Sequence, residues 1–176
     1  MNIYYDSEFT GLKTNPSFIS IGLVADDGSE FYAEFDDYKN PSKWVLNNVI
    51  PNLTNVSYMT LYGDETIYLS NDREDILNSL YIWLLQWETI HIIVDTGMID
   101  WLLFLDLFNW SLPDNVFYMP IDISTLLYSI NVDQDITRTI FVNADEALIK
   151  HNALNDAKVI KLCYEKIMDI ITNGEI

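Results

Sequence analysis

The first twelve residues, MNIYYDSEFTGL (residues 1–12), join an apolar run to two carboxylates. The run from Asn2 to Tyr5 predicts a short strand, and Asp6 and Glu8 close it. Residues two apart in a strand point to the same face, so these two carboxylates would lie side by side. Two like charges at that distance are costly unless they are protonated or neutralised, and hard divalent cations prefer oxygen ligands. The stretch therefore predicts a metal site at the end of the first strand.

The pair of acids is a weak signal by itself, because the chain has 27 acidic residues among 176. Similar pairs occur at 34–36, 72–74 and 133–135. The first pair differs in its context. It ends an apolar strand, and Gly11 follows it, where a tight turn is easily made.

The rest of the chain predicts a mixed α/β layout. The turn Asp26-Asp27-Gly28 joins two β-rich runs as a hairpin, which gives an antiparallel meander of three strands with the first one. Expected strands are 2–5, 18–24, 30–35, 90–94 and 116–119; expected helices are 44–50, 72–87, 98–109, 122–129 and 152–172. Residues 36–43 and 131–138 are expected to be polar loops. This order predicts a sheet with an antiparallel meander, parallel additions and flanking helices, in a single domain over residues 1–176.

The formal charge of −18 is unevenly distributed. Residues 1–136 carry 4 basic and 21 acidic residues, whereas residues 137–176 carry 5 and 6. A solvated acidic surface accounts for most of these charges and disfavours an extended nucleic-acid footprint, which is usually basic. We expect the nearly neutral C-terminal 40 residues to face any bound strand, with Arg138 and Lys150 either contacting phosphates or simply solvated.

Cysteine content and hydropathy bear on the compartment. The single Cys163 excludes an internal disulfide framework and is typical of a reducing compartment, which favours a cytoplasmic location. The start of the chain lacks a signal-peptide pattern, and the apolar runs are too short to span a bilayer. We therefore expect no membrane association.

The motif Asp6-Ser-Glu-Phe-Thr-Gly-Leu12 resembles the first motif of the DEDDh 3′–5′ exonucleases, and within that group the small exoribonucleases and oligoribonucleases. This family also has a third acid at the start of a helix after a central strand, and a His-x4-Asp motif near the C-terminus. Asp100 follows the apolar run that ends at Val94, and His151 precedes Asp156 at the required spacing. The four elements occur in the family's order and cover nearly the whole chain.

One stretch departs from the family pattern. The third motif usually has a His-Asn pair several residues before its acid, but this chain has Asp95-Thr96-Gly97-Met98-Ile99 there. Either Asp95 or Asp100 can therefore be the third acid. We favour Asp100, because acids are stabilised at the start of a helix.

The resemblance implies a ribonuclease H-like fold and a metal-dependent 3′–5′ exonuclease acting on single-stranded nucleic acid, with RNA favoured. It implies two Mg²⁺ or Mn²⁺ ions held by Asp6, Glu8, Asp100 and Asp156, with His151 as general base. A histidine with its ordinary pKa near 6.5 suits that role, and its spacing from Asp156 places it in the loop before the last helix. By the same resemblance Phe9, Thr10 and Leu12 contact the 3′-terminal nucleotide, and two copies can form a homodimer.

Two other functions fit the same residues. An acidic surface can mimic the phosphate backbone and occupy a nucleic-acid-binding partner, and a relative of the exonucleases can serve as an inactive scaffold. His91 lies inside an apolar strand and is expected to be structural.

Overall fold

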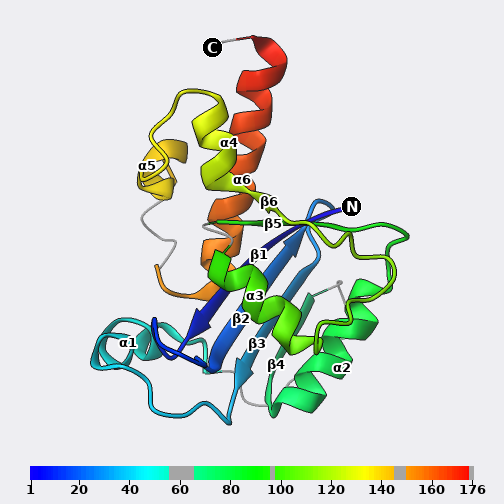
Figure 1. Cartoon of the computed structure of the whole chain (residues 1–176), viewed down its shortest axis with the longest axis vertical. Coiled ribbons are helices and arrows are strands. Elements are labelled where there is room, and N and C mark those ends of the chain that lie inside the picture. Colours follow the sequence, from blue (N-terminus) through cyan, green and yellow to red (C-terminus); the bar gives the residue numbers. More distant parts are fainter. Residues whose placement is uncertain (56–65, 96–97, 145–149, 175–176) are drawn as a thin grey trace.

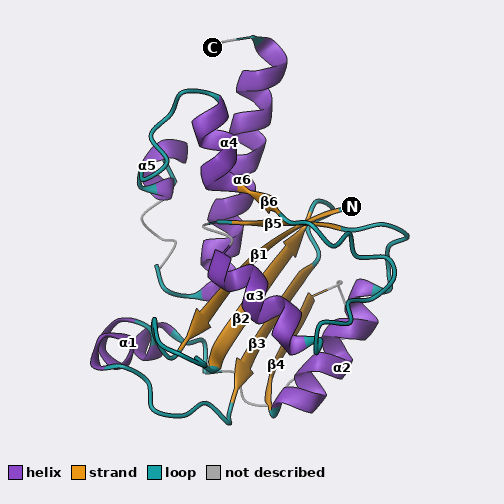
Figure 2. Cartoon of the chain, viewed as in Figure 1, coloured by secondary structure: helices purple, strands orange, loops and turns teal. Residues whose placement is uncertain are grey.

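The computed structural model describes residues 1–55, 66–95, 98–144 and 150–174. Its centre is a six-stranded mixed sheet with the strand order β4-β3-β2-β1-β5-β6 (Figures 1 and 2). The strands are β1 (Asn2–Phe9), β2 (Phe18–Ala25), β3 (Glu30–Phe35), β4 (Thr66–Asn71), β5 (His91–Val94) and β6 (Ile121–Asp122).

Strand direction confirms the predicted fold class. β1, β2 and β3 form an antiparallel meander, while β4, β5 and β6 are added parallel to their neighbours. β1 lies in the interior of the sheet, antiparallel to β2 and parallel to β5. This is the mixed, helix-flanked sheet that the resemblance implies.

Helices cover both faces of this sheet. In the described ranges they are α1 (Lys43–Asn48), the 3-10 turn η1 (Ile50–Asn52), α2 (Arg73–Leu84), α3 (Met98–Leu107), α4 (Ile123–Ser129), α5 (Arg138–Val142) and α6 (Ala153–Asn173). Side chains of α2 and α3 pack on one face, and those of α4, α5 and α6 pack on the other. Asp72, Asp122 and Asn152 cap α2, α4 and α6 through their side chains, as N-cap residues do. None of the helices in the described ranges is long and apolar enough to cross a membrane.

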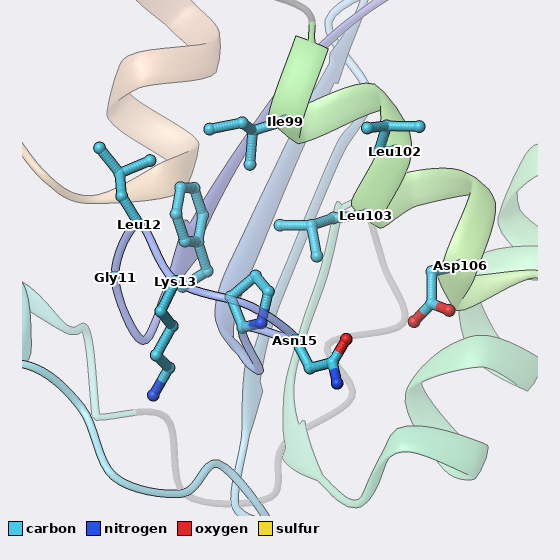
Figure 3. Close-up of a pocket in the computed structure, with 10 residues that line it drawn as sticks. Gly11, Leu12, Lys13, Asn15, Ile99, Leu102, Leu103 and Asp106 are labelled. Carbon is cyan, nitrogen blue, oxygen red and sulfur yellow. The ribbon is translucent and has the colours of Figure 1, made fainter.

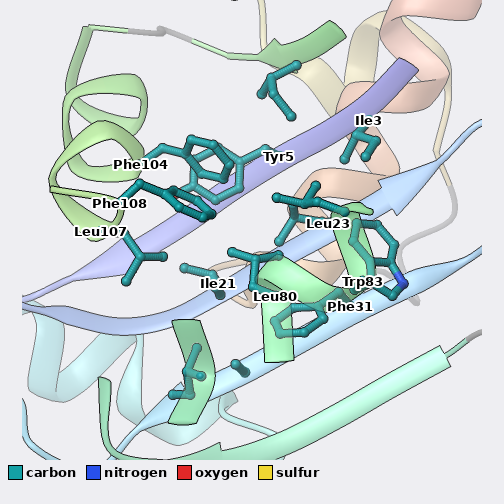
Figure 4. Close-up of a cluster of buried hydrophobic side chains, with 14 of the residues drawn as sticks. Ile3, Tyr5, Ile21, Leu23, Phe31, Leu80, Trp83, Phe104, Leu107 and Phe108 are labelled. Carbon is teal, nitrogen blue, oxygen red and sulfur yellow. The ribbon is translucent and has the colours of Figure 1, made fainter. Parts of the chain in front are cut away.

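The side chains of β1 alternate between two hydrophobic clusters. Ile3 and Tyr5 belong to the larger one, together with α2 and α3 residues such as Trp83 and Phe104 (Figure 4). Tyr4 belongs to the other, which includes Ile160 and Cys163 of α6. The same alternation directs Asp6 and Glu8 toward the α6 face and Ser7 toward the α3 face.

Gly22 allows α6 to approach the sheet closely. It is the partner of Asp6 in the β1–β2 pairing. A Cβ at position 22 would lie 2.3 Å from the carbonyl carbon of Ala153 and 2.4 Å from the amide nitrogen of Leu154. The first turn of α6 therefore rests directly on the strand beside β1, and this contact brings Asp156 to the end of the sheet that carries Asp6.

Three segments differ from the sequence-based expectation. The predicted strand at 116–119 is wrong: Val116 makes a single bridge to Ile90, Phe117, Tyr118 and Met119 are exposed, and the short β6 follows Pro120. The exposed side chains of this run do not pack on a sheet face, and strand propensity stabilises a strand mainly through such packing, so the run does not form a strand. The edge strand β4 was not predicted, since its alternation is diluted by Thr66, Ser70 and Asn71. The five-residue helix α5 is too short to produce a periodic signal.

Candidate active site

Asp6 and Glu8 of β1 and Asp156 of α6 line one pocket of about 250 Å³. Asp156 lies in the first turn of α6, and its Oδ2 accepts a hydrogen bond from the His151 backbone N–H at 2.9 Å. One ligand atom from each of Glu8, His151 and Asp156 lies within 4.8 Å of the other two. Residues at opposite ends of the chain are thus brought within reach of a shared cation.

Asp100 joins this group from α3. It lies in the first turn of that helix and accepts a hydrogen bond from the Ser7 hydroxyl. Ser7, which lies between Asp6 and Glu8 in the sequence, faces α3. Its hydrogen bond to Asp100 therefore ties the first turn of α3 to β1. After burial, the negative charge of Asp100 is one cause of the raised pKa values of Asp6 and Glu8, while the pocket itself is lined by Asp6, Glu8 and Asp156. We call Asp6, Glu8, Asp100 and Asp156 the carboxylate cluster.

Asp95, the other candidate for the third acid, has a cationic partner. Arg138 donates from Nε to Asp95 Oδ2 and from Nη2 to Asp95 Oδ1, both at 2.8 Å. The same Nη2 donates to the Ser124 hydroxyl at 2.7 Å. The side chains of Arg138 and Asp95 are only 14% and 21% exposed, so this forked pair is largely shielded from water. Arg138, which was considered as a phosphate contact, is therefore committed to the fold.

Burial and mutual repulsion govern the carboxylate cluster. Burial, followed by the charges of Asp100, Asp156 and Glu8, raises the pKa of Asp6 well above its usual range. Burial, with the charges of Asp156 and Asp100, raises the pKa of Glu8 to about 8. Burial also raises the pKa values of Asp100 and Asp156 to about 6. Within the described ranges no hydrogen bond or ion pair reaches the side chain of Asp6 or Glu8.

The chemistry of this donor set fits divalent metal ions. The cluster supplies hard carboxylate oxygens, the ligands that Mg²⁺ and Mn²⁺ prefer. Among the described residues no basic side chain forms an ion pair with these four acids, so bound cations would supply the charge that the ionised cluster needs. The arrangement can therefore bind cations at the end of β1 and hold them beside a histidine.

His151 lies in the loop before α6, as its spacing from Asp156 predicts. Its backbone is in the left-handed region, with φ of 62°, and Asn152 is the N-cap that follows it. Its ring contacts the Trp44 ring edge-to-face, with centroids 5.0 Å apart. Burial and the nearby charge of Lys150 lower the pKa of His151, so the imidazole is neutral near pH 7 and able to accept a proton.

Two asparagines hold the His151 segment against η1. Asn52 donates to the Lys150 carbonyl at 2.9 Å, and Asn152 donates to the Asn52 carbonyl at 3.0 Å. Sequence reasoning missed Asn52 and Trp44, because neither belongs to a motif and their partners are about 100 residues away along the chain.

The three substrate candidates after Glu8 differ in their surroundings. Phe9 and Leu12 line a second pocket of about 630 Å³, whose other wall is α3 with Ile99 and Leu102 (Figure 3). The Leu12 side chain is 82% exposed. Thr10 is fully buried; its Oγ1 accepts from the Ser17 amide, and its own amide donates to the Ser17 carbonyl, both at 2.9 Å. Thr10 therefore closes the β1–β2 loop, while Phe9 and Leu12 face a cavity.

Comparison with known proteins identifies relatives of part of this chain. Two proteins of Mycobacterium tuberculosis, from strain CDC 1551 / Oshkosh and strain ATCC 25618 / H37Rv, are each named 3′-5′ exoribonuclease and are 45% identical to this chain over 89 residues. The resemblance to 3′–5′ exoribonucleases is confirmed. The match covers 47% of this chain and 52% of each relative, so the chain spans about half the length of the curated relatives it matches.

No family model matches the chain. Among solved structures, the Neurospora crassa Pan2 catalytic unit (protease and nuclease domain) aligns with 98% of this chain and 28% of its own, at 16% identity and a TM-score of 0.46.

Proposed function

We propose that this chain is a 3′–5′ exonuclease that removes nucleotides from the 3′ end of single-stranded RNA. The observation that carries the proposal is the carboxylate cluster. Its four acids come from β1, α3 and α6 and have raised pKa values, and His151, whose pKa is lowered, lies beside Glu8 and Asp156. The partial match to proteins named 3′-5′ exoribonuclease supports the direction of attack and the choice of RNA.

Two divalent cations, Mg²⁺ or Mn²⁺, would be held by the carboxylate cluster, whose four ionised side chains carry a charge of −4. When bound, such ions activate water and stabilise the attacking and leaving oxygens of a phosphodiester. Asp100 is the third acid in this proposal, because Arg138 already neutralises Asp95. Asp6 and Glu8 contribute from adjacent positions on one face of β1, and Asp156 contributes from the first turn of α6.

His151 would act as the general base. Its lowered pKa leaves the imidazole neutral at physiological pH, so it can take a proton from the attacking water. The Trp44 ring and the bonds made by Asn52 and Asn152 restrict the segment that carries it. The position of the His151 backbone is thereby set by contacts from the β3–β4 connection and by the hydrogen bond from its backbone N–H to Asp156.

Phe9 and Leu12 would contact the 3′-terminal nucleotide. An exposed Leu12 and a partly buried Phe9 offer apolar surface to the face of a base, and contacts of this kind tolerate any sequence. Thr10 would contribute indirectly, by fixing the loop that carries its two neighbours.

A cleavage assay tests this function. A 5′-labelled 12-nucleotide RNA incubated with Mn²⁺ should give a ladder of progressively shorter labelled products, and EDTA should abolish it. Asp6→Asn should also abolish the ladder, whereas Asp114→Asn, which removes one exposed acid from a distant loop, should leave it intact. A matched DNA strand reports the sugar preference. If the wild-type chain shortens neither RNA nor DNA, the exonuclease proposal fails in favour of an inactive scaffold or an acidic binding protein.

A further inference from the structure

The nine basic residues of this chain, all of which lie in described ranges, fall into two groups. Five are bonded inside the fold. Arg73, Arg138 and Lys158 pair with Asp106, Asp95 and Glu30, while Lys161 and Lys166 donate to backbone carbonyls. Four of these five belong to residues 138–166. Arg138 and Lys158 are paired with carboxylates, whereas Lys161 and Lys166 bond only to carbonyls and keep their charge.

The remaining four are Lys13, Lys39, Lys43 and Lys150, all exposed. Within the described residues none of them pairs with a carboxylate. Lys13 donates to the Asn40 carbonyl at 2.7 Å, which positions the side chain without cancelling its charge. These four lysines therefore retain positive charge in a chain of formal charge −18.

Three of the four lie on two segments that contain no acid, although the exposed Asp36 and Asp37 directly precede the second segment and Asp106 lines the pocket beside Lys13. Residues 9–25 and 38–55 contain Lys13, Lys39 and Lys43 but no Asp or Glu, although the chain has 27 acids in all. The two segments are joined by the Lys13 bond and by a hydrogen bond from the Ser42 amide to the Thr10 carbonyl at 3.0 Å. We call Lys13, Lys39 and Lys43 the lysine rim; α1 and the loop that leads to it lie at the end of β1 (Figure 1).

The lysine rim adjoins the proposed active site. The segment 9–25, which carries Lys13, begins directly after Glu8. Lys13 also borders the pocket lined by Phe9 and Leu12 (Figure 3). The segment 38–55, which carries Lys39 and Lys43, contains Trp44, whose ring contacts His151. It also contains Asn52, which donates a hydrogen bond to the Lys150 carbonyl. A strand whose 3′ end lies at the carboxylate cluster can continue along these three lysines, with Asp36, Asp37 and Asp106 at the border of that path.

We propose that the lysine rim binds the RNA strand on the 5′ side of the scissile bond, with its lysines contacting the phosphates of preceding nucleotides. This inference rests on the proposed function and adds a path for the strand. It moves the strand-facing surface from the C-terminal 40 residues, which the charge count favoured, to the β1–β2 loop and α1. Most of RNA affinity comes from phosphate contacts, so three uncompensated lysines at this position matter more than the net charge.

The test compares two double variants with equal charge change. Lys39→Gln with Lys43→Gln removes two positive charges from the rim. Asn78→Asp with Ser111→Asp adds two negative charges at exposed positions outside the rim and the site. Lys13 is left in place, because its bond to Asn40 shapes the loop that carries Leu12. Each pair is made in the Asp6→Asn background for binding and in the wild-type background for cleavage.

Binding of a 5′-fluorescein 12-nucleotide RNA in Ca²⁺ is measured by anisotropy over a range of salt concentrations. The rim variant should bind about 10-fold more weakly at low salt, with a slope of log Kd against log salt reduced by about 1.4, since each phosphate contact on a single strand contributes about 0.7. The charge-matched control should bind within about 2-fold of its parent, because its added charges lie away from the RNA path and long-range charge effects are screened. In cleavage, the rim variant should raise KM for the 12-mer and leave a dinucleotide unaffected, because a dinucleotide ends before the rim.

The outcomes separate this inference from the proposed function. If the wild type cleaves RNA but the two variants bind the 12-mer equally, the rim inference is overturned and the exonuclease stands. If the 12-mer is not bound at all, the inference is overturned as well. If the rim variant alone loses binding while the wild type cleaves nothing, the rim stands as an RNA-binding surface and the exonuclease proposal fails.

Discussion

Asp95 follows the last residue of β5, Asp6 lies within the neighbouring β1, and both line the same pocket, yet their surroundings are opposite. Asp95 receives two hydrogen bonds from Arg138, while within the described part of the chain no cation or donor reaches the Asp6 side chain. The chain therefore supplies its own counter-charge where a carboxylate holds the fold together. Where it supplies none, protons or bound cations must balance the charge, as expected for the metal ligand that we propose Asp6 to be.

The largest expected effect is the loss of catalysis when Asp6, the acid without a cationic partner among the described residues, is replaced. Asp6→Asn should lower kcat for RNA by about 10³-fold or more, which is about 4 kcal/mol in the activation barrier. The same change should leave the unfolding temperature in EDTA unchanged or higher, because it removes repulsion within the cluster. A variant that keeps more than about a tenth of wild-type kcat would contradict the assignment.

The next effect concerns the contact that brings α6 to the cluster. Gly22→Ala should destabilise the fold by about 3 kcal/mol or more, because its methyl group would overlap the backbone of Ala153 and Leu154. Chemical denaturation measures this loss, and Mg²⁺ should protect the variant less than it protects the wild type. Gly28→Asn is the control for a side chain added without overlap: position 28 faces open space, so only the strain of its positive φ remains, which should cost about 1 kcal/mol.

The compensated acid should affect stability more than chemistry. Asp95→Asn leaves Arg138 shielded and without its counter-charge, at a cost of about 2–3 kcal/mol. Asp106→Asn breaks the exposed pair with Arg73, where the side chains are 60% and 40% exposed, and should cost less than about 1 kcal/mol. Equal losses in urea unfolding for the two variants would remove the distinction between a shielded pair and a surface pair.

A smaller effect should appear in the pH dependence of stability without metal. The pKa values of Glu8, Asp100 and Asp156 are raised in the folded state to about 8, 6 and 6, so between pH 4 and 8 the folded chain holds more protons than the unfolded one. The contribution of these groups to stability is therefore present below pH 4 and is lost as pH rises through the folded values. In EDTA the unfolding temperature should fall from pH 5 to 8.

Added Mg²⁺ should oppose that fall, because it replaces the protons that the cluster loses, and the stabilisation should be larger at pH 8 than at pH 5. Scanning fluorimetry on the wild type and on Asp6→Asn measures both slopes. A wild-type unfolding temperature that rises from pH 5 to 8 in EDTA would show that the cluster is not under repulsion.

The central part of this fold was accessible from the sequence, because its signals are local. The hairpin turn at Gly28, the alternation of β3 and the cap at Asp72 each specify one element with little help from the rest. The motif spacing also placed His151 before α6 and Asp156 within it. What the sequence left open depends on contacts between distant segments. Our proposal of Asp100 over Asp95 rests on the position of Arg138, and the exposure of residues 117–119 depends on where the sheet ends.

The left-handed backbone at His151 affects how its role can be tested. Replacing this histidine with alanine would remove the imidazole and also place a residue that disfavours positive φ there, at a cost of about 1–2 kcal/mol. Asparagine tolerates that conformation better and lacks a titratable ring. A loss of turnover in His151→Asn would therefore report the missing proton acceptor, whereas the same loss in alanine would combine chemistry with a displaced loop.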